Sequence, residues 1–169
     1  YHFHNADLVV SINADFLGTW VSPAHFIPDY ISRRKLDNGE KDMLRHIHFE
    51  SGMSLTGANA DIRKKIKPSE EKSLLVDLYN KIAQKTGGAI FPAIPFKEDL
   101  SDLADKLIGS EGRSIVVSGT NNVDIQIIVN GINSLLGSYA NCIDLNNNLN
   151  IASGIDSKTE NFVNDLNSG

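Results

Sequence analysis

Asp7-Leu8-Val9-Val10-Ser11-Ile12 is the stretch of sequence from which the fold is inferred. It is a short apolar run that Asn13-Ala14-Asp15 ends, as is typical of a strand buried on both faces of a parallel sheet. Ser22-Pro23 comes next, and here serine is suited to cap a helix and proline to its first turn. This part of the chain therefore predicts a buried strand, a loop at its carboxyl end, and a helix that ends near Lys35.

The same alternation of strands and helices continues along the chain. Further strands are expected at Leu44–Glu50, Ile62–Lys67, Ile115–Val117 and Cys142–Leu145, with a loop over Ser51–Asp61. Helices are expected from Ser69 to Gly87, over Leu100–Ile108, from Val123 to Leu136 and over Glu160–Leu166. Strands separated by helices imply right-handed crossovers and a sheet covered on both faces. The sequence thus predicts an α/β fold: a Rossmann-like, doubly wound, mainly parallel sheet in a three-layer α/β/α sandwich.

The composition fits a single domain over residues 1–169 and excludes several kinds of partner. A chain of 169 residues is close to the usual size of one domain. The net charge of −5 argues against nucleic acid, since surfaces that follow phosphates are usually basic. No apolar run approaches the ~18 residues of a membrane-spanning helix, so direct membrane insertion is not expected. The lone Cys142 cannot form an internal disulfide or a cysteine-ligated cluster, and we expect it to be buried.

Three loops are expected at the carboxyl ends of the strands, where ligands of doubly wound sheets bind. They carry the candidate binding residues Asp15, Thr19, Glu50, Thr56, Gly119 and Thr120. Gly119-Thr120 precedes a helix, whose N–H groups favour an anion, and Glu50 is suited to accept hydrogen bonds from a ribose. Yet the glycine-rich dinucleotide fingerprint is absent, and Asp15 would repel a pyrophosphate. The residues leave two interpretations: a vestigial nucleotide site, or an Asp15–Thr19 turn cap with Glu50 paired to an arginine.

Histidines form a second pattern. His2 and His4 are two residues apart, and so are His46 and His48. If the two pairs converged, they would suit Zn²⁺ or Cu²⁺, whereas the alternative is that they are ordinary polar residues of strands. No nucleophile elbow, zinc-protease motif or P-loop accompanies them, so the sequence predicts no catalytic residue.

Four longer segments together carry a resemblance to a known family. They are Ala14-Asp15-Phe16-Leu17-Gly18-Thr19-Trp20, Arg45-His46-Ile47-His48-Phe49-Glu50-Ser51, Ser54-Leu55-Thr56-Gly57-Ala58-Asn59-Ala60-Asp61 and Val117-Ser118-Gly119-Thr120-Asn121. In this order they closely resemble the molybdopterin-oxidoreductase-like iron–sulfur subunit of alternative complex III, the quinol:electron-acceptor oxidoreductase of bacterial membranes. The resemblance extends over most of the chain, from Asp7 to Leu145.

The resemblance implies that the chain is a fragment of a larger protein, from its molybdopterin-like N-terminal part. Iron–sulfur clusters would be held elsewhere in that parent, and the fragment itself would carry no cofactor. Its partners would be the other domains of the parent and the subunits of a membrane quinol-oxidising complex. The location implied is the periplasmic face of the bacterial inner membrane.

The same resemblance bears on catalysis, because related molybdenum enzymes hold a guanine dinucleotide at the strand ends. Asn13 and Asp15 stand where those enzymes usually have glycine and asparagine, and Glu50-Ser51 replaces an Asp-Pro turn. Thr56 and Asp61 are expected to shape the loop. We therefore expect a non-catalytic scaffold domain. The alternative is the domain of an active oxidoreductase that binds molybdopterin guanine dinucleotide.

Overall fold

The computed structural model describes residues 1–36, 42–147, 149 and 155–168. Within them, four parallel strands form one sheet in the order β3-β2-β1-β4. The strands are β1 (Leu8–Ile12), β2 (Arg45–Glu50), β3 (Ile62–Lys65) and β4 (Ser114–Ser118). The α-helices are α1 (Pro23–Ser32), α2 (Leu55–Asn59), α3 (Glu71–Thr86), α4 (Ser101–Gly109), α5 (Val123–Leu135) and α6 (Asp156–Ser168). Short 3₁₀ turns are η1 (Phe3–Asn5), η2 (Pro68–Glu70) and η3 (Ser138–Ala140).

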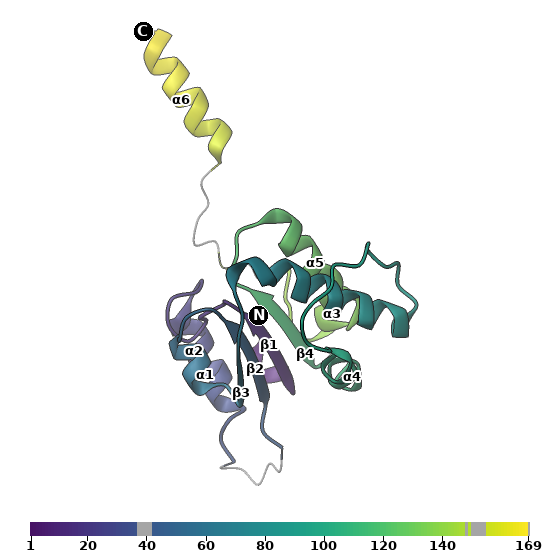
Figure 1. Cartoon of the computed structure of the whole chain (residues 1–169). Coiled ribbons are helices and arrows are strands. Elements are labelled where there is room, and N and C mark those ends of the chain that lie inside the picture. Colours follow the sequence, from purple (N-terminus) through teal and green to yellow (C-terminus); the bar gives the residue numbers. More distant parts are fainter. Residues whose placement is uncertain (37–41, 148, 150–154, 169) are drawn as a thin grey trace.

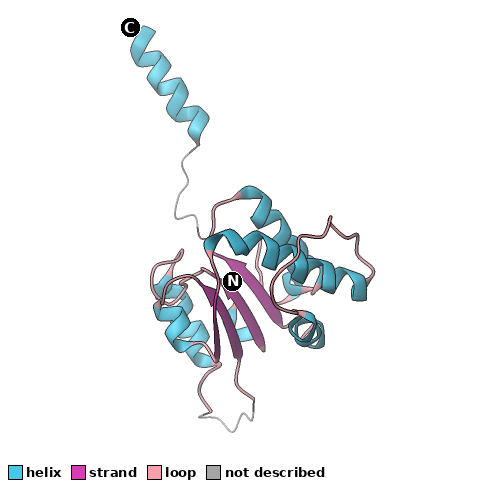
Figure 2. Cartoon of the chain, viewed as in Figure 1, coloured by secondary structure: helices cyan, strands magenta, loops and turns pink. Residues whose placement is uncertain are grey.

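The connections between the strands produce the expected three layers. The chain runs from β1 to β2 through α1 and on to β3 through α2, then returns through α3 and α4 to β4 on the other side of β1. Helices α1 and α2 lie on one side of the sheet, and α3, α4 and α5 lie on the other (Figures 1 and 2). The prediction of a Rossmann-like doubly wound fold is therefore confirmed. The direction of winding reverses between β1 and β4, so the switch point lies at their carboxyl ends.

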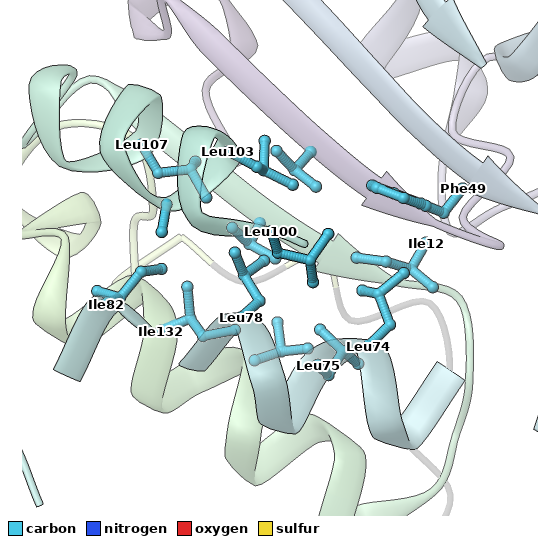
Figure 3. Close-up of a cluster of buried hydrophobic side chains, with 14 of the residues drawn as sticks. Ile12, Phe49, Leu74, Leu75, Leu78, Ile82, Leu100, Leu103, Leu107 and Ile132 are labelled. Atoms are coloured by element: carbon cyan, nitrogen blue, oxygen red, sulfur yellow. The ribbon is translucent and has the colours of Figure 1, made fainter. Parts of the chain in front are cut away.

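Each face of the sheet has its own apolar core. Val10 and Ile12 of β1 and Phe49 of β2 pack against the leucines and isoleucines of α3, α4 and α5 (Figure 3). Val9 points to the opposite face, where it joins the aromatic cluster that includes Phe26 of α1. Successive side chains of a strand alternate between faces, so a run that is apolar throughout fills both cores. None of the described helices has the length and apolar character needed to cross a bilayer.

The strand expected at Cys142–Leu145 is wrong, because another group already fills the edge beside β4. The backbone N–H and carbonyl of Val116 point away from β1, towards the outer edge of the sheet. There the side chain of Asn133, from α5, forms hydrogen bonds with both groups. The amide oxygen of Asn133 accepts from the Val116 N–H (2.9 Å), and its Nδ2 donates to the Val116 carbonyl (2.7 Å). Cys142 instead lies in a turn after η3, buried as expected, and burial raises the pKa of its thiol to about 11.

Smaller boundary errors have local causes. The expected loop over Ser51–Asp61 contains α2, because the Ser54 side chain caps it by accepting from the Gly57 N–H (2.9 Å). Helix α1 ends at Ser32 rather than near Lys35, and the Arg33 N–H turns back to the Tyr30 carbonyl. The expected segment at Glu160–Leu166 lies within α6, which has no buried residue.

Candidate functional site

The first turn of α2 donates backbone hydrogen bonds to two carboxylates that follow neighbouring strands. The Thr56 N–H donates to Asp15 Oδ1 (2.9 Å), and the Ser54 N–H donates to Glu50 Oε2 (3.0 Å). Free N–H groups at the start of a helix favour negative charge. In this protein the negative charge comes from its own side chains.

Asp15 is held in the loop after β1 by two threonines. The Thr19 hydroxyl donates to Asp15 Oδ2 (3.2 Å), and the Thr56 hydroxyl oxygen accepts from the Leu17 N–H (2.9 Å). Burial alone would raise the pKa of Asp15, but the hydrogen bonds from Thr56 and Thr19 outweigh it and lower that pKa. The Asp15 carboxylate is therefore ionised, and it joins the β1 loop to α2.

Glu50, at the end of β2, is buried and has three hydrogen-bond donors. They are the Ser54 N–H, the Arg63 Nε–H and His48 Nε2, which lies 3.1 Å away. Burial by itself would raise the pKa of Glu50, but the hydrogen bonds from Ser54, Arg63 and His48 outweigh it and lower that pKa. The carboxylate also lies directly over Gly57, where a Cβ atom would come within 2.0 Å of Glu50 Oε1.

A chain of buried hydrogen bonds leads from Glu50 across the sheet to α1. His48 Nδ1 lies 2.5 Å from the Ser11 hydroxyl, which lies 2.7 Å from His46 Nε2. His46 Nδ1 in turn lies 3.1 Å from the Tyr30 hydroxyl, which is also 3.2 Å from the Asn59 carbonyl. Ser11, His46 and His48 are fully buried. Side chains of β1 and β2 therefore form one continuous polar row beneath α1.

The charge on Glu50, together with neutral histidine rings, sets the direction of the bonds from Glu50 as far as His46. An ionised carboxylate only accepts, so His48 donates from Nε2 and accepts at Nδ1 from the Ser11 hydroxyl. By the same logic, Ser11 accepts from His46 Nε2. The single proton of the Tyr30 hydroxyl then faces two acceptors, His46 Nδ1 and the Asn59 carbonyl. Burial lowers the pKa of His46 to about 3, helped by repulsion from His48, and burial also lowers the pKa of His48. Both rings are thus neutral, as this direction requires, and burial raises the pKa of Tyr30 to about 12, which keeps its proton.

Gly119 and Thr120 close the switch point from the side of β4. The Gly119 N–H donates to the Ile12 carbonyl (2.9 Å), and a Cβ atom on Gly119 would lie 2.1 Å from the Asn13 carbonyl oxygen. The Thr120 hydroxyl accepts from the Asn122 N–H (3.2 Å). The two turns that follow β1 and β4 are therefore in direct backbone contact.

Glu71 is a further residue of this edge that the sequence analysis placed only in the first turn of a helix. It is buried at the start of α3, where its Oε1 accepts from the Ser118 hydroxyl (2.5 Å). Its Oε2 lies 3.4 Å from Asn13 Nδ2. A carboxylate thus joins the ends of β1 and β4, and it would repel a phosphate group there.

The structure brings four of the six predicted residues together. Asp15, Thr19, Thr56 and Glu50 converge on α2, whereas no hydrogen bond among the described residues joins Gly119 or Thr120 to them. Ser11, Glu71 and the participation of His48 were not predicted from the sequence. The one sequence signal for the position of the Glu50 carboxylate was Gly57, next to Thr56, because glycine leaves room for it. This signal can be interpreted only once the fold is known.

The histidine pairs lie in different places. His46 and His48 belong to the buried row, and His2 and His4 lie near Asp29 of α1. The described part of the chain contains no metal-ligating group that joins the two pairs. The hypothesis of a four-histidine metal site, one of the two interpretations that the sequence left open, is therefore wrong.

Fold and site define the class of protein: a Rossmann-like α/β domain whose strand-end polar groups bond chiefly to one another. A scan of the chain against protein-family models matches none, and a search of curated proteins finds no match. The family expectation therefore rests on the sequence segments quoted above.

Proposed function

We propose that this chain is a non-catalytic scaffold domain of a respiratory electron-transfer subunit similar to the iron–sulfur protein of alternative complex III. The observation that carries the proposal is the closure of the strand-end edge by the protein's own groups. In a nucleotide-binding Rossmann domain, this edge would receive a phosphate and a ribose. In this chain the corresponding groups are already paired.

Two features of the edge disfavour a dinucleotide. Gly119 packs against the Asn13 carbonyl, which leaves no separation between the two turns at the switch point. Glu71 places a buried carboxylate between the ends of β1 and β4, and carboxylate and phosphate repel most strongly where water is excluded. Both features support a structural role for the edge.

An exposed apolar surface supports a role in packing against other domains or subunits. Helix α6 has no buried residue, and Phe162, Val163 and Leu166 are 61%, 48% and 65% exposed. Exposed apolar residues of this size are often covered by a partner. On this proposal the partners are the remaining domains of the parent protein and the neighbouring subunits at the periplasmic face of the membrane.

Calorimetric titration of the chain with GDP tests the closed edge. We expect no saturable binding. A dissociation constant of about 1 µM or tighter would contradict the proposal. Loss of that binding in Glu50→Gln, but not in the exposed α6 control Glu160→Gln, would locate it at the strand ends and favour the molybdopterin alternative.

Elemental analysis of the full-length parent tests the electron-transfer part of the proposal. We expect iron without molybdenum or tungsten, because the iron–sulfur clusters lie outside this domain. About one molybdenum or tungsten per chain would favour the active oxidoreductase, which would then hold its cofactor despite Asp15 and Glu71. A parent without iron would contradict any electron-transfer role of this kind.

A further inference from the structure

Two histidines and an aspartate from separate segments gather beside the start of β1. One donor atom each from His2, His4 and Asp29 lies within 4.8 Å of the other two. His4 Nδ1 is 2.7 Å from Asp29 Oδ1, and the rings of His2 and His4 are 5.3 Å apart at their centroids. The three groups are half-buried or exposed, so they are open to an ion from solvent.

The packing around Phe3 holds this cluster in place. Phe3 lies between the two histidines in sequence and is fully buried, stacked on Phe16 with ring centroids 4.5 Å apart. The His2 N–H also donates to the Cys142 carbonyl (2.8 Å). Asp29 belongs to the regular helix α1. The backbone positions of all three side chains are therefore fixed by the core and not by the cluster itself.

One oxygen of the cluster lacks a hydrogen bond. Asp29 Oδ2 is buried, and within the described part of the chain it has no hydrogen-bond partner. Buried carboxylate oxygens are almost always paired, and a bound cation satisfies them as well as a hydrogen bond does. Asp144 adds a second negative charge nearby, with Oδ2 3.8 Å from His2 Nε2. The unpaired oxygen is independent of the histidine geometry, and it points to the same kind of ligand.

We propose that His2, His4 and Asp29 bind one divalent transition-metal ion, with Zn²⁺ as the best-suited member of the class. Two imidazoles and one carboxylate are a donor set that Zn²⁺ accepts, with solvent in the fourth position. Ligands of a tetrahedral zinc ion lie ~3.3 Å apart, so His4 and Asp29 must separate slightly as their hydrogen bond gives way to the metal. His2 and Asp144 also line a cavity of about 570 Å³, which His4 and Asp29 do not line.

The bound ion would join the segment before β1 to α1. This role is independent of the scaffold proposal, because the cluster shares no residue with the carboxylates that α2 holds. It also differs from the four-histidine site considered from sequence, since Asp29 takes the place of the buried pair.

Calorimetry with Zn²⁺ on the metal-free chain tests the proposal, with the N-terminus acetylated so that the α-amino group cannot bind. We expect one ion per chain with a dissociation constant of about 10 µM or tighter. His4→Ala and Asp29→Asn should each weaken binding by at least the 10–100-fold that loss of a supporting group costs a metal site. The control is His25→Ala, an exposed histidine of the same helix outside the cluster. Circular dichroism confirms that each variant is folded.

Cobalt substitution provides a second readout that does not depend on affinity. Co²⁺ in a site of low coordination number gives intense visible absorption, which we expect for the wild-type chain and His25→Ala but not for His4→Ala. Absence of saturable 1:1 zinc binding would overturn the proposal. Equal weakening by His25→Ala and His4→Ala would overturn it as well, since it would show that zinc binds histidines without regard to the cluster.

Discussion

Replacing Asn133 with leucine should strongly destabilise the fold, because this side chain takes the place of a neighbouring strand. Its amide is fully buried and bonds to both the N–H and the carbonyl of Val116, at 2.9 and 2.7 Å. Leucine has the same number of side-chain heavy atoms, branched at the same position, so the substitution removes the hydrogen bonds without leaving a cavity.

The magnitude follows from the two backbone groups left without partners. A buried donor or acceptor that loses its partner costs about 1–3 kcal/mol, so Asn133→Leu should lower the free energy of unfolding by about 2–6 kcal/mol. With a urea dependence of about 2 kcal/mol/M, the middle of the range for small proteins, the midpoint of unfolding should fall by roughly 1–3 M.

Urea unfolding followed by circular dichroism measures this change. Asn130→Leu is the matched control, because Asn130 is exposed on the same helix and a surface substitution of this kind changes stability by only about 0.5 kcal/mol. If the two variants unfolded at the same midpoint, Asn133 would not satisfy the edge of β4, and the explanation for the missing strand would be refuted.

Three other substitutions or titrations test the strand-end edge and the buried polar row. Gly119→Ala places a Cβ atom 2.1 Å from the Asn13 carbonyl oxygen and should cost about 1–3 kcal/mol in urea unfolding, whereas Gly52→Ala, which meets nothing within 4 Å, should be neutral; equal costs would contradict the close contact. Glu50→Gln should lower stability by about 1–3 kcal/mol at neutral pH. Because the folded-state pKa of Glu50 lies below its ordinary 4.5, the stability from its charge is complete above 4.5 and is lost as pH falls through the folded value, so the gap between variant and wild type should narrow in acid; a constant gap would contradict this. For His46, burial holds the pKa near 3 instead of the ordinary 6.5, so the unfolded state takes up the proton first and stability falls by about 1.4 kcal/mol per pH unit from 6.5 towards 3. NMR should show the His46 ring signals unchanged from about pH 8 to 5, and a midpoint near 6.5 would show that the ring is not buried as described.

Local signals explain why most of the fold could be predicted from sequence. Apolar runs such as Leu8–Ile12 and helix signals such as Ser22-Pro23 depend on residues close together in the chain. The segment at Cys142–Leu145 has the same kind of apolar run, but a run becomes a strand only beside a free edge. Whether the edge of β4 was free depended on Asn133, whose side chain turns inward only in the folded helix. No local pattern distinguishes that asparagine from the exposed ones.

In the candidate site, too, contacts between residues close in sequence could be predicted, whereas contacts that depend on the fold could not. Thr19 and Asp15 are only four residues apart in the chain, so their contact could be predicted as a turn cap. The Glu50–arginine pair was one of two interpretations, and only the register of β2 and β3 identifies Arg63 as the partner. Glu71 reaches the switch point because the chain crosses back from β3 past β1 to β4. Its position at the start of a helix does not by itself predict its contact with Ser118.

The number of acceptor sites on Glu50 favours one of the two interpretations that the sequence left open, the pairing of Glu50 with an arginine. A carboxylate has about four lone-pair directions. The Ser54 N–H, Arg63 and His48 occupy three of them. The fourth is restricted by Gly57, whose Cα side lies so close that a Cβ atom would meet Glu50 Oε1 at 2.0 Å. A ribose diol needs two acceptors from one carboxylate, so it could bind only by displacing Arg63 or His48. Displacing His48 would leave its buried Nε2–H without a partner and disturb the row as far as Tyr30. From the sequence, Glu50 is the residue best suited to bind a ribose. In the structure its carboxylate is held by three hydrogen bonds that a ribose would have to break, and this is the physical reason for giving Glu50 a structural role.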